Sequence, residues 1–379
     1  NIARLMFTEA EATLMTSRLA YLPSISFEPS GTLRSVDGNA MTKSYDIAAS
    51  ASWEVDIFGK LTNAKRGAKA ALEQSEAYRQ AVQTQLIATI ANSYYSLLML
   101  DAQLDISERT AANWGENVRA MKALKAAGDA TELAVAQSEA SKLSVDASIA
   151  SLRQQIDQME NTLTALLGIA PQKIDRTTIG EQRFPTELAA GVPLQLLQRR
   201  PDVRQSEAAL AQAFYATNAA RAAFYPSITL SGSAGWTNAA GAAITNPGQW
   251  LFTAVGSLVQ PLFNRGKNIA NLRIAKAQQE EALLSFRQSL LDAGTDVNNA
   301  LIQWQTARQR QQIDQQQILS LESTVRSSEL LMQYSSQNYL EVLTARQTLL
   351  QAELTAVSDR FDEIQGVINL YHALGGGAE

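Results

Sequence analysis

The chain has 379 residues and a formal net charge of −5, and its basic residues are scattered, so no basic patch for binding nucleic acid is visible. It has no cysteine and a single histidine, His372, which excludes disulfides, cysteine nucleophiles and multi-histidine metal centres. No apolar run reaches the roughly 18 residues that a membrane-spanning helix needs.

The prolines divide the chain into two similar halves. None lies between Pro29 and Pro171 and none follows Pro261, so two stretches of more than a hundred residues contain no proline helix breaker. The tripeptide Pro-Ser-Ile introduces each stretch, at 23–25 and 226–228. We therefore predict an internal two-fold structural repeat with these parts: a first copy at 1–170, a connecting equatorial belt at 171–200 and a second copy at 201–379.

The first copy begins with a helix over about 1–20 and continues with a β-hairpin at about 23–58. Apolar and polar residues alternate along the hairpin, which is the pattern of a strand with two unlike faces. One face of the return strand carries Tyr45, Ile47, Ala49, Ala51, Trp53, Val55 and Ile57. The other face carries Ser44, Asp46, Ser50, Ser52, Glu54 and Asp56.

A long helical hairpin is predicted at about 59–168. Apolar residues keep a 3-4 spacing from Leu86 to Met121, and sixty-odd helical residues correspond to about 100 Å. Residues 127–131 form the turn, and Gly168 followed by Pro171 ends the return helix.

The second copy repeats this order. A helix begins at Pro201 and Asp202, a β-hairpin follows at about 226–263, and a second long helical hairpin is predicted at about 266–373. Its turn lies at 335–338. The pairs Gly59-Lys60 and Gly266-Lys267 lack a phosphate-loop pattern, so we interpret them as junctions between strand and helix.

The strands have two open interpretations. A soluble four-stranded sheet covered by helices would also alternate. A membrane barrel is favoured by strands of about 10–15 residues and by a small, polar opposite face. It is also favoured by aromatic residues near strand ends: Tyr45, Trp53, Trp236 and Trp250. In a barrel, the carboxylates that face the water-filled lumen are Asp46, Glu54 and Asp56.

Four strands cannot close a barrel, because the smallest membrane barrels have eight and an open edge is excluded from lipid. Three chains would together supply twelve strands. The long helices keep a heptad-like pattern rich in alanine and serine, which fits packing on two sides in a closed wall, with an ordinary antiparallel bundle as the alternative. The predicted fold class is an α+β membrane protein: a trimeric shared 12-stranded β-barrel, four strands per chain, continued by a long α-helical coiled-coil tunnel.

Four segments resemble the motifs of one known family. They include Arg199-Arg200-Pro201-Asp202 within 191–204 and Phe224-Tyr225-Pro226-Ser227 within 223–232, together with 53–60 and 339–345. Along essentially its whole length the chain resembles the outer membrane efflux proteins. These are the TolC-like outer membrane factors, here in the lipoprotein-type branch that serves resistance-nodulation-division pumps.

The resemblance implies a homotrimer in the bacterial outer membrane that contacts lipid and extends into the periplasm. Its helical turns would contact a periplasmic adaptor (membrane fusion) protein, which links to an inner-membrane transporter, with no cofactor, metal or nucleic acid. The adaptor-contacting turn residues would be Gly128, Asp129, Thr131, Ser335, Gln337 and Asn338. The channel constriction would be formed by Leu340, Glu341 and Thr344.

Two departures from the family pattern are visible. Thr344 stands where an aspartate is common, and Glu341, three residues earlier, would supply the acidic ring instead. The lipid-modified N-terminal cysteine of this branch is not in the sequence. Because the chain starts at Asn1 within a helical pattern, we interpret this as a processed or truncated start.

The function favoured by these observations is a passive export duct gated at its periplasmic tip, in an efflux system of the multidrug-resistance type. A periplasmic coiled-coil scaffold without transport activity is one alternative, but it does not explain two aromatic-edged hairpins. A type I secretion exit duct is another. An enzyme is disfavoured because no constellation of acid, base and nucleophile stands out. Drugs, metal ions and siderophores all remain open as cargo.

Overall fold

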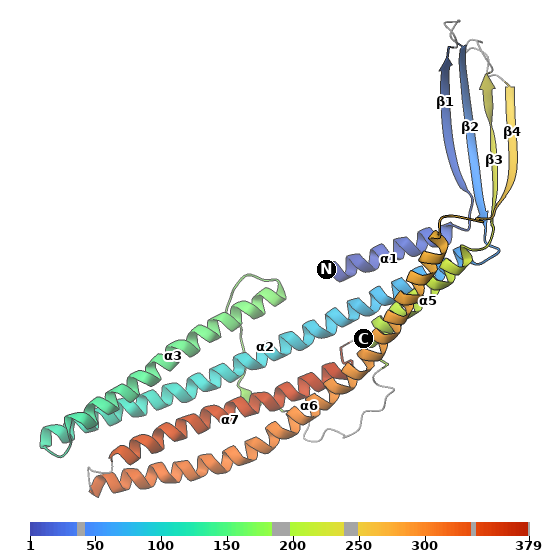
Figure 1. Cartoon of the computed structure of the whole chain (residues 1–379). Helices are drawn as coiled ribbons and strands as arrows, with labels where there is room; N and C mark the ends of the chain where they lie inside the picture. Colours follow the sequence, from blue (N-terminus) through green and yellow to red (C-terminus); the bar gives the residue numbers. More distant parts are fainter. Residues whose placement is uncertain (36–41, 184–197, 239–248, 335–338, 378–379) are drawn as a thin grey trace. The chain divides into compact units, whose positions relative to one another are not determined.

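The computed structural model describes residues 1–35, 42–183, 198–238, 249–334 and 339–377 (Figure 1). The order of a helix, two strands, a very long helix and a shorter helix occurs twice along the chain. In the first half these elements are α1 (Ile2–Leu19), β1 (Ser24–Arg34), β2 (Thr42–Val55), α2 (Lys60–Ala127) and α3 (Glu132–Leu167). In the second half they are α5 (Pro201–Ala222), β3 (Ser227–Asn238), β4 (Gln249–Val259), α6 (Lys267–Tyr334) and α7 (Tyr339–Ala373). Between the halves lies the short 3₁₀ turn η1 (Ile179–Glu181).

Contacts divide the chain into two units. The first contains Asn1–Ala81 and Pro201–Leu291, and the second contains Val82–Arg200 and Asp292–Glu379. Each unit therefore contains residues from both halves of the sequence. The predicted division into 1–170, 171–200 and 201–379 describes the repeat along the chain, which is a different division, and it stays a prediction.

The first unit contains a four-stranded antiparallel sheet in the order β1-β2-β3-β4, so the two predicted hairpins join through β2 and β3 (Figure 1). The register aligns Ser26 with Ser50, Ser50 with Ser233, and Ser233 with Thr253. Each strand alternates between faces, so these four hydroxyl residues share one face across the whole sheet. The residues between them, such as Ala49 beside Phe27 and Ala234, form the apolar face.

A glycine stands where each hairpin passes into its long helix. Gly59 and Gly266 both have φ of 76°, a left-handed conformation that an L side chain disfavours. The helices begin at the next residues, Lys60 and Lys267, which confirms the predicted junctions. At the first junction the Asn63 side chain also donates a hydrogen bond to the Gly59 carbonyl, over 2.7 Å.

The second unit is built on contacts that α2 makes on two sides. On one side, Leu97 and Leu100 of α2 pack with Ile156 and Leu163 of α3. On another side, Leu98 packs with residues of α7, so α2 is covered by both helices. The predicted apolar stripe is largely buried, although Leu86 is 42% exposed. Both α2 and α6 have 68 residues, which is about 100 Å of helix and matches the predicted length.

The described part of the connecting segment is held by two arginines of the second unit. Arg176 donates to Asp101 of α2 (2.9 Å from Nη2 to Oδ1) and to the nearly buried Glu160 of α3. Arg200 is 4% exposed and donates to the Ala373 carbonyl at the end of α7, over 3.2 Å.

The helix α3 is closed by the C-cap residue Gly168, which has φ of 71° and donates to the Ala165 carbonyl, as the sequence predicted.

Within the described ranges, no helix combines the length and the apolar character needed to cross a membrane.

Candidate functional site

The polar face of the sheet is a surface of hydroxyl groups. A shallow hollow of about 320 Å³ on it is lined mainly by Ser24, Ser26, Ser50, Ser52, Ser231, Ser233 and Thr253. The Ser26 and Ser50 hydroxyls are 2.7 Å apart, and Ser24 donates to the Ser52 carbonyl over 3.2 Å. These groups bond to each other and to the backbone and remain open to water. The Ser26 hydroxyl also donates to the Glu28 carboxylate over 3.1 Å. The surface is therefore hydrophilic and carries a carboxylate near the middle of β1.

Two of the three predicted lumen carboxylates lie on this polar face. Asp46 is paired in register with Ser30 and Thr237, and Glu54 with Thr229. The Glu54 carboxylate accepts a hydrogen bond from Lys60 Nζ over 2.7 Å, and both side chains are solvent-accessible. The structure thus places Asp46 and Glu54 on one face, near opposite ends of β2.

Asp56 has a different environment from the predicted one. It lies one residue beyond the end of β2, and its carboxylate accepts from the backbone amides of Leu61 (2.9 Å) and Thr62 (2.7 Å). Burial alone would raise the pKa of Asp56. The hydrogen bonds from the Thr62 hydroxyl and from the amides of residues 60–62 outweigh it, so this pKa lies below its usual value. Asp56 therefore caps the first turn of α2, and its predicted place on a strand face is corrected, while its place in the lumen stays a prediction.

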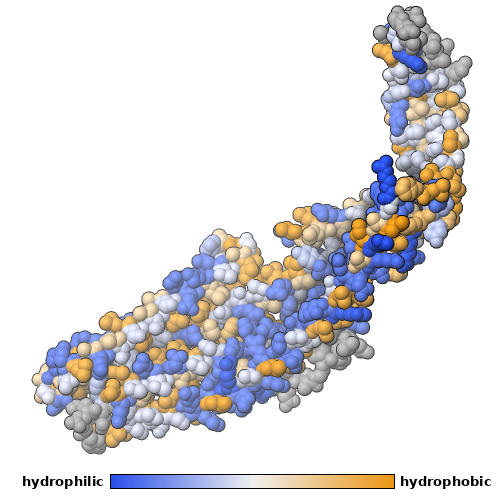
Figure 2. All heavy atoms as spheres, in the orientation of Figure 1, coloured by the Kyte–Doolittle hydropathy of each residue, from blue (hydrophilic) through white to orange (hydrophobic). Residues whose placement is uncertain are grey.

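The opposite face of the sheet is apolar and exposed. Trp250 is 64% exposed and Phe252 is 73% exposed, although both are large apolar side chains. Trp250 contacts Trp236 with ring centroids 4.4 Å apart. Figure 2 shows apolar residues along the sheet and at the end where its strands pass into helices. A continuous apolar face of this kind marks a surface that another apolar phase covers.

The turn between α2 and α3 forms one helical tip. Gly128 has φ of 88° and Asp129 donates to the Leu124 carbonyl over 2.9 Å, which closes the end of α2. Thr131 is the N-cap of α3, because its hydroxyl accepts from the Ala134 amide over 3.2 Å. Gly128, Asp129 and Thr131, the predicted tip residues of this turn, are all exposed, and Thr131 also caps α3.

The start of α7 forms the second tip, and it packs on the first. Tyr339 donates to the Gln137 side chain over 2.6 Å, and Tyr339 and Met332 pack against Met121 and Val135. The other predicted tip residues, at 335, 337 and 338, lie outside the described residues.

The predicted constriction residues Leu340, Glu341 and Thr344 are brought together by the structure. All three are exposed and line one open groove of about 700 Å³ between α6 and α7. The residues beside them, Val342 and Ala345, are buried against the neighbouring helices. The Thr344 hydroxyl donates to the Leu340 carbonyl over 2.9 Å, so its own hydrogen-bonding need is met within the helix.

An arginine next to this groove was missed by the sequence reasoning. Arg346 of α7 donates from Nε to Glu329 of α6 over 3.0 Å and from Nη1 to the Asn113 carbonyl of α2 over 3.3 Å. It therefore joins three helices close to the tip. Arg176 of the connecting segment was also missed, and its partners Asp101 and Glu160 are distant from it in sequence. No local motif marks either contact, because a single charged residue is usually solvated.

Comparison with known proteins gives consistent matches over the whole chain. A model of the family described as outer membrane efflux protein matches residues 2–169 and 192–376. The cation efflux system protein CusC of Escherichia coli (strain K12) is 29% identical over 379 residues, which cover 99% of this chain and 83% of that protein. The pyoverdine export outer membrane protein OpmQ of Pseudomonas aeruginosa is 33% identical over 377 residues, which cover 98% of this chain and 78% of that protein.

The solved structures agree with these matches. A crystal structure of CusC superposes with a TM-score of 0.92 at 28% identity, over 99% of this chain and 88% of that chain. The open state of the MtrE outer membrane channel of Neisseria gonorrhoeae superposes with a TM-score of 0.90 at 28% identity, over 100% of this chain and 86% of that chain.

The contact of Arg346 generates a prediction. Replacing Arg346 with Met keeps the aliphatic stem and removes the hydrogen bonds to Glu329 and Asn113. Hydrogen bonds to charged groups contribute about 1.5–3 kcal/mol, so amides in the first turns of α7 should exchange with deuterium at least about tenfold faster. The control is Arg119→Met, since Arg119 and its partner Glu116 are both exposed and 3.9 Å apart. Equal exchange in the two variants would contradict a role of Arg346 in holding the tip.

Proposed function

The chain belongs to the outer membrane efflux protein family, and we propose that three copies of it close one β-barrel and one helical tunnel. The protein is an outer-membrane channel of a tripartite efflux system, located in the outer membrane and extending into the periplasm. Its relatives are channel proteins. The observation that carries the proposal is a single sheet with one hydroxyl face, one exposed apolar face and two edge strands.

The edges of the sheet argue for a shared barrel. Within the described part of the chain, β1 and β4 each have one neighbouring strand and one open side. An unpaired strand edge in hydrocarbon leaves backbone N–H and C=O groups without any partner, which costs several kcal/mol for each group. Pairing β1 of one copy with β4 of the next removes both edges. Three copies would give twelve strands, an even number within the usual range of membrane barrels.

The two faces of the sheet argue for its orientation. Trp53, Trp236 and Trp250 belong to the apolar face and would contact outer-membrane lipid, with the hydroxyl face turned to the lumen. Asp46 and Glu54 would then stand in the lumen near its two ends. The lumen between them would be lined mainly by serine and threonine hydroxyls, together with the Glu28 carboxylate that accepts from Ser26.

The helices would form the periplasmic part of the duct. Because α2 already packs on two sides within one copy, helices with small, alanine-rich flanks suit a closed wall of repeated helical hairpins. The tips at Gly128, Asp129 and Thr131, and at residues 335–338, would contact a periplasmic adaptor that links to an inner-membrane transporter. The internal two-fold repeat would let the two helical hairpins of each chain occupy similar places in the wall.

The groove at the start of α7 is the proposed gate. Leu340, Glu341 and Thr344 share one exposed surface, so three copies could direct three carboxylates and three apolar side chains toward one axis. Like charges close together repel, so a closed gate depends on other contacts, such as those of Arg346. Glu341 also has a simpler explanation, because a carboxylate in the first turn of α7 interacts favourably with the positive end of the helix dipole. A measurement of ion selectivity distinguishes this role from a role in the constriction.

The cargo is proposed only as a broad class. CusC is described as a cation efflux protein and OpmQ as a pyoverdine exporter, so relatives of similar identity serve different substrates. A lining made mainly of hydroxyl groups fits a passive duct for hydrated solutes, with selection made by the transporter. The scaffold and type I secretion alternatives lack support from the relatives, which are efflux channels.

The oligomeric state is the direct test of the proposal. The full chain should extract only in detergent and behave as a stable trimer, because one sheet of four strands cannot close. Native mass spectrometry or light scattering with detergent correction measures the assembly mass. A stable monomer would rule out the shared barrel.

The orientation of the sheet generates a second prediction. Ala49→Arg and Ala254→Arg should impair membrane insertion, by about 2–4 kcal/mol if the sites lie near the bilayer midplane. Ser50→Arg and Ser52→Arg are the matched controls on the hydroxyl face of the same sheet, and they should insert almost normally. Refolding into vesicles under increasing urea measures the difference. Equal tolerance of the two pairs would show that the faces are assigned the wrong way.

The gate generates a third prediction. Glu341→Lys should shift single-channel selectivity from cations toward anions, and Glu341→Gln should give an intermediate value, because the first change reverses the charge and the second removes it. Planar-bilayer recordings in a salt gradient measure the reversal potential. If selectivity and conductance match the wild type in both variants, Glu341 does not belong to the constriction.

A further inference from the structure

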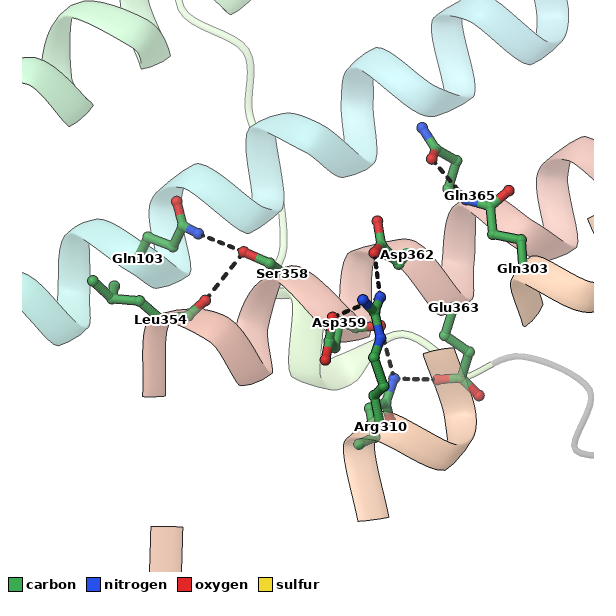
Figure 3. Close-up of polar contacts among 10 residues, drawn as sticks. Gln103, Gln303, Arg310, Leu354, Ser358, Asp359, Asp362, Glu363 and Gln365 are labelled. Atoms are coloured by element: carbon green, nitrogen blue, oxygen red, sulfur yellow. Dashed lines mark hydrogen bonds and ion pairs between the residues drawn. The ribbon is translucent and has the colours of Figure 1, made fainter. Parts of the chain in front are cut away.

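The helices α6 and α7 of the second unit face each other through a polar cluster (Figure 3). Arg310 of α6 donates to Asp359 (2.7 Å) and to Asp362 (2.6 Å) of α7. Gln311 of α6 donates to Glu363 over 2.8 Å and to the Asp359 carbonyl over 3.2 Å. One turn along α6, Asp314 adds another carboxyl group to this contact.

Two of these carboxyl groups are nearly excluded from water. Asp359 is 5% exposed and Asp314 is 7% exposed. Asp314 lies within hydrogen-bonding reach of Asp359, and its buried Oδ2 atom has no hydrogen-bond partner among the described residues. Two ionised carboxylates can only accept hydrogen bonds, so such a contact is repulsive unless one of them carries a proton.

The surrounding charges do not neutralise the pair. Arg310 is about half exposed and divides its guanidinium between Asp359 and Asp362. On α7, Arg360 is paired with Glu363. The nearby contact of α2 is neutral, since Gln103 donates to Ser358 over 3.0 Å. The cation of Arg310 is thus shared by Asp359 and Asp362, and Asp314 adds a third carboxyl group beside Asp359.

We propose that Asp314 and Asp359 form a proton-binding site in which one shared proton links α6 to α7 by an O–H···O hydrogen bond. The proton leaves to solvent as the pH rises, and the two carboxylates then repel across the helix contact. Loss of the proton loosens this part of the helical hairpin. A metal ion is not favoured here, because no group of three or more His, Cys, Asp or Glu side chains among the described residues is placed so that it could hold one.

The direction of the titration agrees with this geometry. Burial, followed by the hydrogen bond with Asp314, raises the pKa of Asp359 to about 6, even though the charge of Arg310 opposes the rise. The ordinary pKa of an aspartate is 3.8. At pH values between 3.8 and about 6, the closed contact between α6 and α7 therefore binds more protons than the same contact when it is opened. The stabilisation by the proton is complete at the acidic end of this range and is lost as the pH rises through about 6.

Infrared difference spectroscopy on the full chain in detergent tests the site directly. Between pH of about 5 and 7.5, the wild type should lose the carbonyl band of a buried protonated carboxyl group, with a midpoint near the raised pKa of Asp359. The band should be absent from both Asp359→Asn and Asp314→Asn. The control is Asp362→Asn, which removes a more exposed partner of Arg310 and should keep the band. A wild type without the band, or a band that survives in both single variants, would overturn the proposal.

Hydrogen exchange tests the mechanical consequence. Amides around 307–318 and 355–363, corrected for intrinsic rates, should be protected about tenfold less at pH of about 7.5 than at about 5. In Asp314→Asn the side-chain amide can donate to the Asp359 carboxylate at every pH, so this dependence should disappear. The same pH dependence in the variant and the wild type would refute the shared proton. These measurements do not require that the chain conducts solutes, so they are independent of the proposed gate.

Discussion

The two open edges of the β-sheet are the constraint on which the rest of the molecule depends. Backbone groups at β1 and β4 need hydrogen-bond partners, and a membrane offers neither water nor backbone to supply them. Pro29 lies in β1, and proline without an N–H group is tolerated mainly at edges, which agrees with the position of this strand. In the proposed trimer, assembly would be a condition of insertion, because one sheet of four strands cannot be complete alone. The apolar face, the aromatic side chains and the hydroxyl face would acquire their proposed roles only when that assembly closes.

The second unit follows from close helix packing rather than from a large apolar core. Gly366 of α7 lies so near α6 that an added Cβ atom would come within 2.9 Å of the Trp304 backbone. Many of the buried residues on α6 and α7 are alanines, which bury little apolar area each but let backbones approach. Directional polar contacts therefore contribute more than apolar packing to fixing how the helices align along one another. Arg346 with Glu329 and Arg310 with Asp359 are examples.

The sequence predicted the repeated features better than the isolated ones. Proline spacing, period-two alternation and 3-4 spacing are signals summed over many residues, so the strands, the long helices and the Gly59 and Gly266 junctions were predicted correctly. Asp56 was assigned to a strand face because the alternation continues one residue past the end of β2, where capping of α2 takes over. The contacts of Arg176 and Arg346 could not be predicted, because the partners of each lie far from it in sequence and each residue alone looks like a solvated surface charge. Leu340, Glu341 and Thr344 were identified by resemblance, and their common groove became visible only with α6 beside α7.

Polar groups serve opposite purposes in the two units. On the sheet, hydroxyls bond to neighbouring strands and to the Glu28 carboxylate, and they present a wettable surface. Among the helices, some paired charged groups, such as Glu160 and Asp359, are buried, and their net contribution depends on whether both partners keep their charge and position. Truncating one partner of such a pair leaves the other buried and uncompensated, so these contacts are strong in one arrangement and unfavourable in another. The proposed helical wall must be closed at rest and open during transport, and contacts of this kind can stabilise the closed arrangement and destabilise it once a partner moves or loses its charge. A large apolar core would instead resist every rearrangement equally.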